Sequence, residues 1–242
     1  MTAMRDNPIT GLATADAAAQ GPVDKSGEAY RFSPALPAME TPPRSPAAVA
    51  VSGIAAALIT QQLERGRRGV AVCGASAGAG VTFVAGNLAV AITRAGYSVL
   101  LVDANLHGAG VEALFVPPAD GPQGLQQVLR PDGAPLYSVI HREVIPGLSI
   151  LYNGGATPDA SELLGAATLR SVLDECLRDY DYTVFDTPPA NRSPDARRVA
   201  SIVGYSLIVA RRDLTYADDV STLARELASD GALVIGTLFN DR

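Results

Sequence analysis

The chain has 242 residues, of which 48% are hydrophobic and 18% are charged, and its formal net charge is −6. At roughly 150 residues per domain, this length predicts one large domain or two small ones. A chain with this hydrophobic content can bury a core, so a fully disordered protein is excluded. The negative charge argues against non-specific binding of nucleic acid, because displacing counterions from phosphates needs a basic surface.

Neither the cysteine content nor the N-terminus points to an exported protein. Two cysteines, Cys73 and Cys176, are too few for a disulfide scaffold or a cysteine-based zinc site. The first residues lack the apolar segment of a signal peptide. The longest apolar stretch, 47–59, is shorter than the ~20 residues that cross a bilayer. We therefore expect a soluble, cytoplasmic chain.

Residues 1–44 contain six prolines among alanine, glycine, serine and aspartate, with few large aliphatic side chains. Such a segment buries too little apolar surface to offset the entropy lost on ordering. The composition predicts a flexible, disordered tail over 1–44. This tail could tether or dock a partner, or it could be a plain unstructured extension.

From residue 45 the chain alternates between helical and strand-like segments. The expected helices cover 45–66, 82–94, 161–179, 193–202 and 216–229, and the expected strands cover 69–73, 98–103, 148–154, 182–186, 205–210 and 233–239. Strands that are apolar on both faces and alternate with helices predict a mainly parallel sheet covered on both sides. We therefore predict one doubly wound α/β domain over 45–242.

A glycine- and alanine-rich loop, 74–82, joins the first of these strands to a helix. Ligands of doubly wound sheets bind beyond the carboxyl ends of the strands, and small residues before a helix let backbone N–H groups face a phosphate. The full phosphate-loop signature also needs a lysine and a hydroxyl. Aligned on Gly80 and Thr82, the hydroxyl is present, but Val81 occupies the lysine position. The candidate binding residues of this loop are Gly78, Ala79, Gly80, Val81, Thr82 and Phe83.

Two carboxylates end predicted strands at the same edge of the sheet as this loop. Asp103 closes SVLLVD and Asp186 closes YTVFD. Carboxylates near a Ser or Thr at strand ends suit a Mg²⁺–nucleotide site, and they also commonly cap the next turn or helix. On the first interpretation, Thr82, Asp103 and Asp186 are the candidate Mg²⁺ ligands.

Several segments match, in order and in spacing, the motifs of a known family. They are SVLLVDAN (98–105), PGLSILYNGG (146–155), PDASELLGAATLRSVLDEC (158–176), YDYTVFDTPPA (180–190) and VIGTLFN (234–240). Together they resemble the bacterial tyrosine kinases (BY-kinases) of polysaccharide export, which are relatives of the MinD and ParA ATPases. The resemblance implies a P-loop nucleotide-binding fold, with ATP or ADP and Mg²⁺ as cofactors. It also implies that Asn240 contacts the nucleotide base.

The chain departs from the family pattern at the positions that carry the chemistry. The phosphate-loop lysine is Val81, and the motif Asp-x-Asp-x-Arg reads Asp103, Asn105, His107. The ring-assembly motif Glu-x-x-Arg-x-x-Arg is replaced by Val49, Ser52 and Ala55, and no tyrosine cluster follows Asn240. Phosphoryl transfer depends on positioned positive charge, so these losses make efficient kinase chemistry improbable.

Three basic features have an ordinary interpretation beside a functional one. His107 and His141 are the only histidines, too few for a zinc triad, although His107 lies near the expected phosphate site. Arg211 and Arg212 follow a strand, where they could reach a nucleotide or a partner, or simply face solvent. The basic residues at 65, 67 and 68 are too few to anchor the chain to anionic lipid alone.

The leading hypothesis is a degenerate, non-catalytic BY-kinase-like protein of exopolysaccharide or capsule-type biosynthesis. The resemblance implies a cytoplasmic chain held at the inner membrane by a Wzz-like polysaccharide co-polymerase. The lysine lost at Val81 predicts weak or absent nucleotide binding, and the negative net charge argues against a nucleic-acid partner. A homo-oligomer stays open, although the ring motif is missing. The alternatives are an active tyrosine kinase or ATPase of the same pathway, and a MinD/ParA-like spatial regulator.

Overall fold

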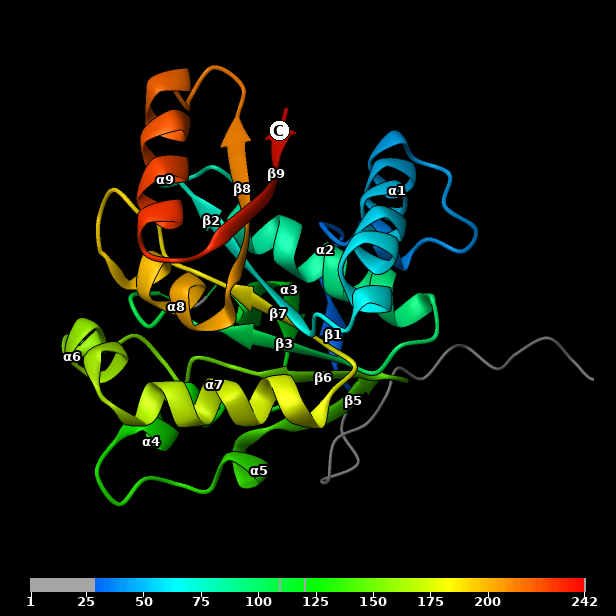
Figure 1. Cartoon of the computed structure of the whole chain (residues 1–242). Helices are drawn as coiled ribbons and strands as arrows, with labels where there is room; N and C mark the ends of the chain where they lie inside the picture. The colour runs from blue at the N-terminus through cyan, green and yellow to red at the C-terminus, as the bar shows by residue number, and fades with distance from the viewer. Residues whose placement is uncertain (1–28, 109, 120, 242) are drawn as a thin grey trace, which may run out of the picture.

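Seven strands form one sheet in the order β5-β6-β3-β7-β2-β8-β9 (Figure 1). The computed structural model describes residues 29–108, 110–119 and 121–241. All pairings in this sheet are parallel except that of β5 with β6. The predicted doubly wound α/β fold is confirmed. The strands of the sheet are β2 (Gly69–Gly74), β3 (Val99–Asp103), β5 (His141–Ile145), β6 (Leu148–Leu151), β7 (Tyr182–Asp186), β8 (Tyr205–Arg211) and β9 (Leu233–Asn240).

Helices cover both faces of this sheet, as Figure 1 shows. α1 and α2 pack over one face, and α7, α8 and α9 over the other. The longer helices are α1 (Pro46–Gln61), α2 (Val81–Arg94), α6 (Ala160–Gly165), α7 (Thr168–Asp179), α8 (Asp195–Val203) and α9 (Ala217–Ser229). Shorter helices are α3 (Val111–Leu114), α4 (Leu125–Leu129) and α5 (Leu136–Val139), with 3₁₀ turns at Pro37–Met39 and Leu63–Arg65.

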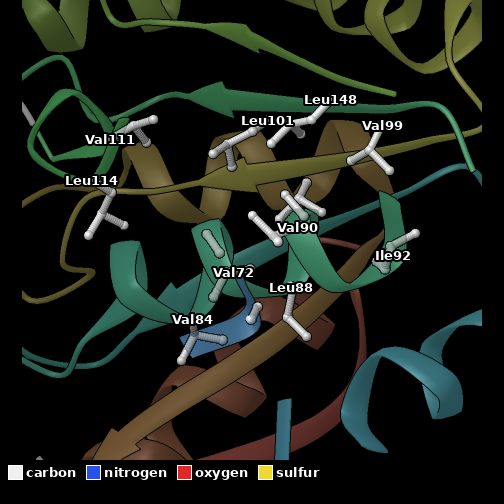
Figure 2. Close-up of a cluster of buried hydrophobic side chains, with 14 of the residues drawn as sticks. Val72, Val84, Leu88, Val90, Ile92, Val99, Leu101, Val111, Leu114 and Leu148 are labelled. Atoms are coloured by element: carbon white, nitrogen blue, oxygen red, sulfur yellow. The ribbon is translucent and has the colours of Figure 1, made fainter. Parts of the chain in front are cut away.

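The two helix layers exist because successive strand residues point to opposite faces. In β2, Val70 and Val72 pack into the α2 cluster, whereas Ala71 and Cys73 pack into the cluster beneath α7 and α8. All four side chains are fully buried. Figure 2 shows the first cluster, in which Leu88 and neighbouring side chains of α2 face those of the sheet. This packing fixes α2, and therefore the loop that precedes it, against the sheet.

Two details differ from the expected elements. The helix expected over 161–179 is two helices, α6 and α7, because the chain turns at residues 166–167. The antiparallel edge strand β5 was not expected. Its first three residues, His141, Arg142 and Glu143, are polar and partly or fully exposed, so the strand lacks the apolar run that marks the others.

The expected tail requires a correction for residues 29–44, which we call the N-terminal strap. Here β1 (Arg31–Phe32) pairs antiparallel with β4 (Phe115–Val116), and the Pro37–Met39 turn follows. Tyr30, Leu36 and Ala38 are buried in the same cluster as α2. Composition averaged over 1–44 hides these few apolar residues, which bury enough surface to order the strap. Residues 1–28 lie outside the described part of the chain.

α1 begins where the strap ends, with the hydroxyl of Ser45 accepting a hydrogen bond from the Ala48 N–H. Among the described residues, Pro46–Arg65 is the one helical stretch long and apolar enough to cross a membrane by length and composition. Core helices of globular proteins pass the same test, and α1 packs against α2 through buried residues that include Val51 and Leu58.

One buried side chain fastens the strap to α2. The Asn87 carbonyl oxygen accepts from the Ala38 N–H (3.0 Å), and its amide nitrogen donates to the Ala35 and Phe83 carbonyls (3.1 and 2.8 Å). Asn87 is fully buried, so no water replaces these bonds if the side chain is removed.

We expect Asn87→Ala to lower the free energy of unfolding by about 2 kcal/mol, because it leaves buried backbone groups of the strap without partners. Urea unfolding measures the change. The matched control is Asn191→Ala, which truncates an exposed asparagine and should change stability by less than about 0.5 kcal/mol. Equal effects of the two substitutions would contradict the role assigned to Asn87.

Candidate functional site

The loop between β2 and α2 curls over the carboxyl edge of the sheet. Gly78 (φ 81°) and Gly80 (φ 94°) adopt the left-handed backbone conformation that glycine takes without strain. The first hydrogen bond of α2 runs from the Val84 N–H to the Gly80 carbonyl. The N–H groups of the first turn therefore have no acceptor within the helix, which is the usual arrangement of an anion-binding cradle.

Side chains from β8 and β9 hold the outside of this loop. Arg211 donates through Nη1 to the Gly78 carbonyl (3.1 Å), and Asn240 donates through Nδ2 to the Ala79 carbonyl (3.1 Å). A Cβ at Gly80 would collide with the Asn240 amide. These two bonds occupy the Gly78 and Ala79 carbonyls and tie the loop to β8 and β9. Asn240 thus reaches the loop itself, and its contact with a nucleotide base stays a prediction.

Val81, at the lysine position, turns into the protein rather than toward an anion. Its side chain is 8% exposed and belongs to the apolar cluster around α2. A Cβ on Gly74 would lie 2.6 Å from Val81 Cγ2, so the valine rests on the start of the loop. Phe83 lies half-buried in an apolar groove beside α1 and β9. At this site Phe83 can therefore offer its backbone N–H but not its ring.

Asp103 and Asp186 lie side by side because they are register partners at the ends of β3 and β7. Both are fully buried. Thr82 donates its hydroxyl to Asp186 Oδ2 (2.7 Å), and Asp103 accepts from the N–H groups of Asn105 (3.0 Å) and Val111 (3.2 Å). Asp186 Oδ1 has no hydrogen-bond partner in the described part of the chain. The structure thus brings the three candidate Mg²⁺ ligands together.

Burial makes ionisation of this pair unfavourable. Burial raises the pKa of Asp186 to about 7, against the lowering effect of the Thr82 hydrogen bond. Burial and then the neighbouring charge of Asp186 raise the pKa of Asp103 well above its usual range. Neither carboxylate forms an ion pair with a basic side chain of the described residues.

The oxygen donors at this edge fit Mg²⁺, which is commonly bound by one or two carboxylates together with substrate phosphates. The unpartnered Oδ1 of Asp186 is the observation that favours such an ion. Across the described residues, no group of three or more His, Cys, Asp or Glu is arranged to hold a metal on its own. A cation here would therefore depend on the Thr82 hydroxyl and on ligand oxygens to complete its coordination.

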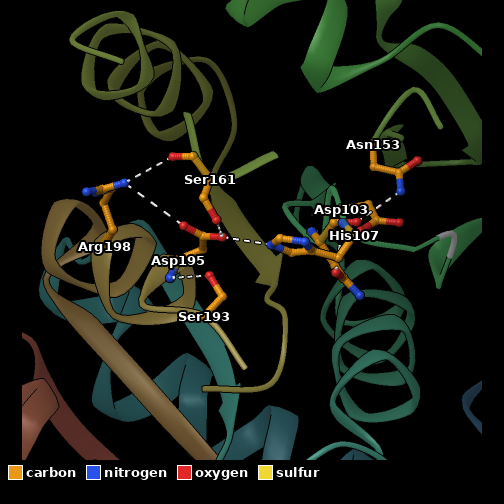
Figure 3. Close-up of polar contacts among 8 residues, drawn as sticks. Asp103, His107, Asn153, Ser161, Ser193, Asp195 and Arg198 are labelled. Carbon is orange, nitrogen blue, oxygen red and sulfur yellow. Dashed lines mark hydrogen bonds and ion pairs between the residues drawn. The ribbon is translucent and has the colours of Figure 1, made fainter. Parts of the chain in front are cut away.

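Residues after β3 and β7 complete the surroundings. A Cβ at Gly110 would lie 2.7 Å from Thr82 Oγ1 and 3.3 Å from Asp186 Oδ2, so this loop rests directly on the pair. His107 turns away from the loop at 74–82 and bonds through Nε2 to Asp195 Oδ2 (2.8 Å; Figure 3). Sequence reasoning did not single out Gly110 or Asp195 as site residues, although Asp195 lies in a segment, 193–215, that resembles the family.

Comparisons with known proteins identify the family of this chain. The model of the family described as cellulose biosynthesis protein BcsQ matches residues 68–236. The solved kinase domain of the Escherichia coli tyrosine kinase Etk is 31% identical, with a TM-score of 0.77 over 85% of this chain and 79% of that domain. The chain belongs to the family of BcsQ and the bacterial tyrosine kinases. The resemblance drawn from its motifs is confirmed.

The curated relatives are longer than the segment that they share with this chain. The curated tyrosine-protein kinase Etk of Escherichia coli K12 is 31% identical over 198 residues, which are 82% of this chain and 27% of Etk. The chain thus spans about a quarter of the length of the curated relatives matched first. The fold extends to MinD of Pyrococcus horikoshii, solved with Mg-ADP, at 22% identity and a TM-score of 0.61 over 72% of this chain and 70% of that one.

We expect Asp186→Asn to stabilise the protein at high pH. The pKa of Asp186 is raised, so folding favours its protonated form, and stability falls as pH rises from the ordinary value near 4 through about 7. The variant escapes this loss. Its advantage over the native chain should be small at about pH 4 and reach about 2–4 kcal/mol at about pH 8.

Urea unfolding at the two pH values, without divalent cations, measures this difference. Asp174→Asn, which neutralises an exposed carboxylate on α7, is the control and should show no such pH dependence. A loss of stability in Asp186→Asn that is the same at both pH values would contradict the assignment.

Proposed function

We propose that this protein is a BY-kinase-like chain that has lost catalytic function and acts in exopolysaccharide or capsule-type biosynthesis. It serves there as the cytoplasmic partner of a Wzz-like inner-membrane co-polymerase. The observation that carries the proposal is Val81, which packs into the core at the position where the family places the P-loop lysine. The surrounding cradle keeps its shape, and its cation is missing.

The free energy lost with the lysine–phosphate contact affects catalysis more than it affects nucleotide binding. A charge-assisted contact to phosphate contributes about 1.5–3 kcal/mol in the ground state, which is about 10–100-fold in affinity. It contributes more in the transition state, where charge builds up on the transferring phosphoryl group. The buried carboxylates at 103 and 186 increase the need for positive charge. The site is therefore suited to weak nucleotide binding without efficient turnover.

The partner in this proposal follows from the resemblance to a family in which such a domain can be a separate chain partnered with a membrane co-polymerase. Matched kinases such as Etk are about four times as long as the matched segment. The exposed side of α1 bears Val49 (56% exposed) in place of the first charged residue of the ring motif. Ala55, at the last motif position, is buried. Ring assembly through these charges is therefore not part of the proposal.

A second candidate is an active ATP-dependent tyrosine kinase or ATPase of the same pathway. The observation that favours it is Arg211, whose guanidinium donates to the Gly78 carbonyl. This contact places a permanent positive charge against the loop. On this alternative the charge that Val81 lacks comes from β8. A measurement of ATP turnover separates the two candidates, because the non-catalytic protein of the first proposal would not hydrolyse ATP.

Calorimetric titration with Mg-ATP tests the first candidate. We expect no micromolar affinity in the native chain, and an affinity about tenfold or more higher in Val81→Lys, because an ammonium returns to the cradle. Val81→Met is the uncharged control and should not gain affinity. Circular dichroism establishes that both variants fold.

Two results would count against the proposal. Micromolar binding by the native chain would show that the missing lysine does not limit the site. A folded Val81→Lys variant with no gain would show that the cradle itself no longer accepts phosphate.

A further inference from the structure

A second pocket lies next to the segments that follow Asp103 and Asp186. It has a volume of about 370 Å³ and lies between the segment after β3 and the segment joining β7 to α8. None of the residues 74–82 lines it. Its polar wall is formed by Asn105, His107, Arg192 and Ser193, and its apolar wall by the adjacent prolines at 188 and 189.

A buried carboxylate fixes one side of this pocket. Asp195, at the start of α8, is fully buried and holds His107 through Nε2 (2.8 Å), while Ser161 donates its hydroxyl to the same oxygen (2.9 Å; Figure 3). Burial alone would raise the pKa of Asp195, but hydrogen bonds from Ser193, His107 and Ser161 outweigh it and hold this pKa below its ordinary value. The carboxylate is therefore ionised, and the imidazole is held in place with Nδ1 left for a ligand.

Two other polar side chains of the pocket, Asn105 and Arg192, are left as donors. The Asn105 side-chain oxygen accepts from the His107 N–H (3.3 Å), which leaves the Asn105 amide nitrogen to donate. Ser193 Oγ accepts from the Asp195 N–H (3.1 Å), and its hydroxyl is already engaged by the Asp195 carboxylate. The Arg192 guanidinium is exposed and meets no acceptor among the described side chains and carbonyls. A guanidinium and an amide N–H that have no acceptor of their own call for an anion.

The arrangement of these donors indicates which anion. One guanidinium fork satisfies a planar carboxylate, whereas donors from two facing segments suit the several oxygens of a tetrahedral group. The two proline rings add an apolar surface on which a carrier group can pack. We propose that this pocket binds a phosphate monoester, with the phosphate held by Arg192 and Asn105 beside His107.

This proposal does not depend on nucleotide binding by the loop at 74–82, so the test must tell the two places apart. The ¹⁵N-labelled chain is titrated with phenyl phosphate, glucose 1-phosphate and inorganic phosphate, each to about 10 mM, which saturates a site of millimolar affinity or better. Saturable amide shifts are expected at residues 105–108 and 190–193, with smaller changes at 76–82. At least one ester should bind more tightly than inorganic phosphate.

A matched pair of arginine variants completes the test. Arg192→Gln should weaken ester binding about tenfold. Arg198→Gln removes an exposed arginine that lies near Asp195 (4.0 Å) but does not line the pocket. The affinity of this variant for the ester should stay within about twofold of that of the native chain.

Three outcomes would overturn the proposal. They are no saturable shift with any probe, shifts confined to 76–82, and equal loss in both variants, which would mean general surface charge.

Discussion

Two carboxylates side by side in a buried strand edge are the constraint on which the rest of this site depends. Parallel pairing of β3 with β7 makes Asp103 and Asp186 register partners, so neither can move away without breaking the sheet. Both are removed from water, and no basic side chain among the described residues neutralises them. A buried uncompensated charge is costly, so the pair holds protons or requires a cation.

Contacts from several elements hold the loop at 74–82 beside this pair. Arg211 and Asn240 bind its carbonyls, and Gly78 and Gly80 take the left-handed conformation. These contacts arise from β8 and β9, and α2 is fixed from behind by the strap through Asn87. None of them involves the side chain at position 81. The loop geometry therefore does not depend on a lysine at this position, and on the proposed function only the charge is lost.

The sequence predicted the fold and the main site residues because both have local signatures. Strands apolar on two faces mark a covered parallel sheet, and Asp103 and Asp186 stand at strand ends where topology brings them together. The rest depended on long-range contacts. Nothing near Arg211 shows that it reaches Gly78, and nothing near Asp195 shows that it holds His107. The strap was missed because few apolar residues among many prolines were enough to order it.

The central claim is that the phosphate cradle is intact and lacks the cation that made it catalytic. The most direct measurement is phosphate release by the purified chain at saturating Mg-ATP, compared with Asp186→Asn. The account predicts that both proteins stay at the rate of the buffer alone. Sustained phosphate release by the native chain, abolished by Asp186→Asn, would contradict the proposed loss of catalysis. The carboxylates would then act together with a cation other than the missing lysine.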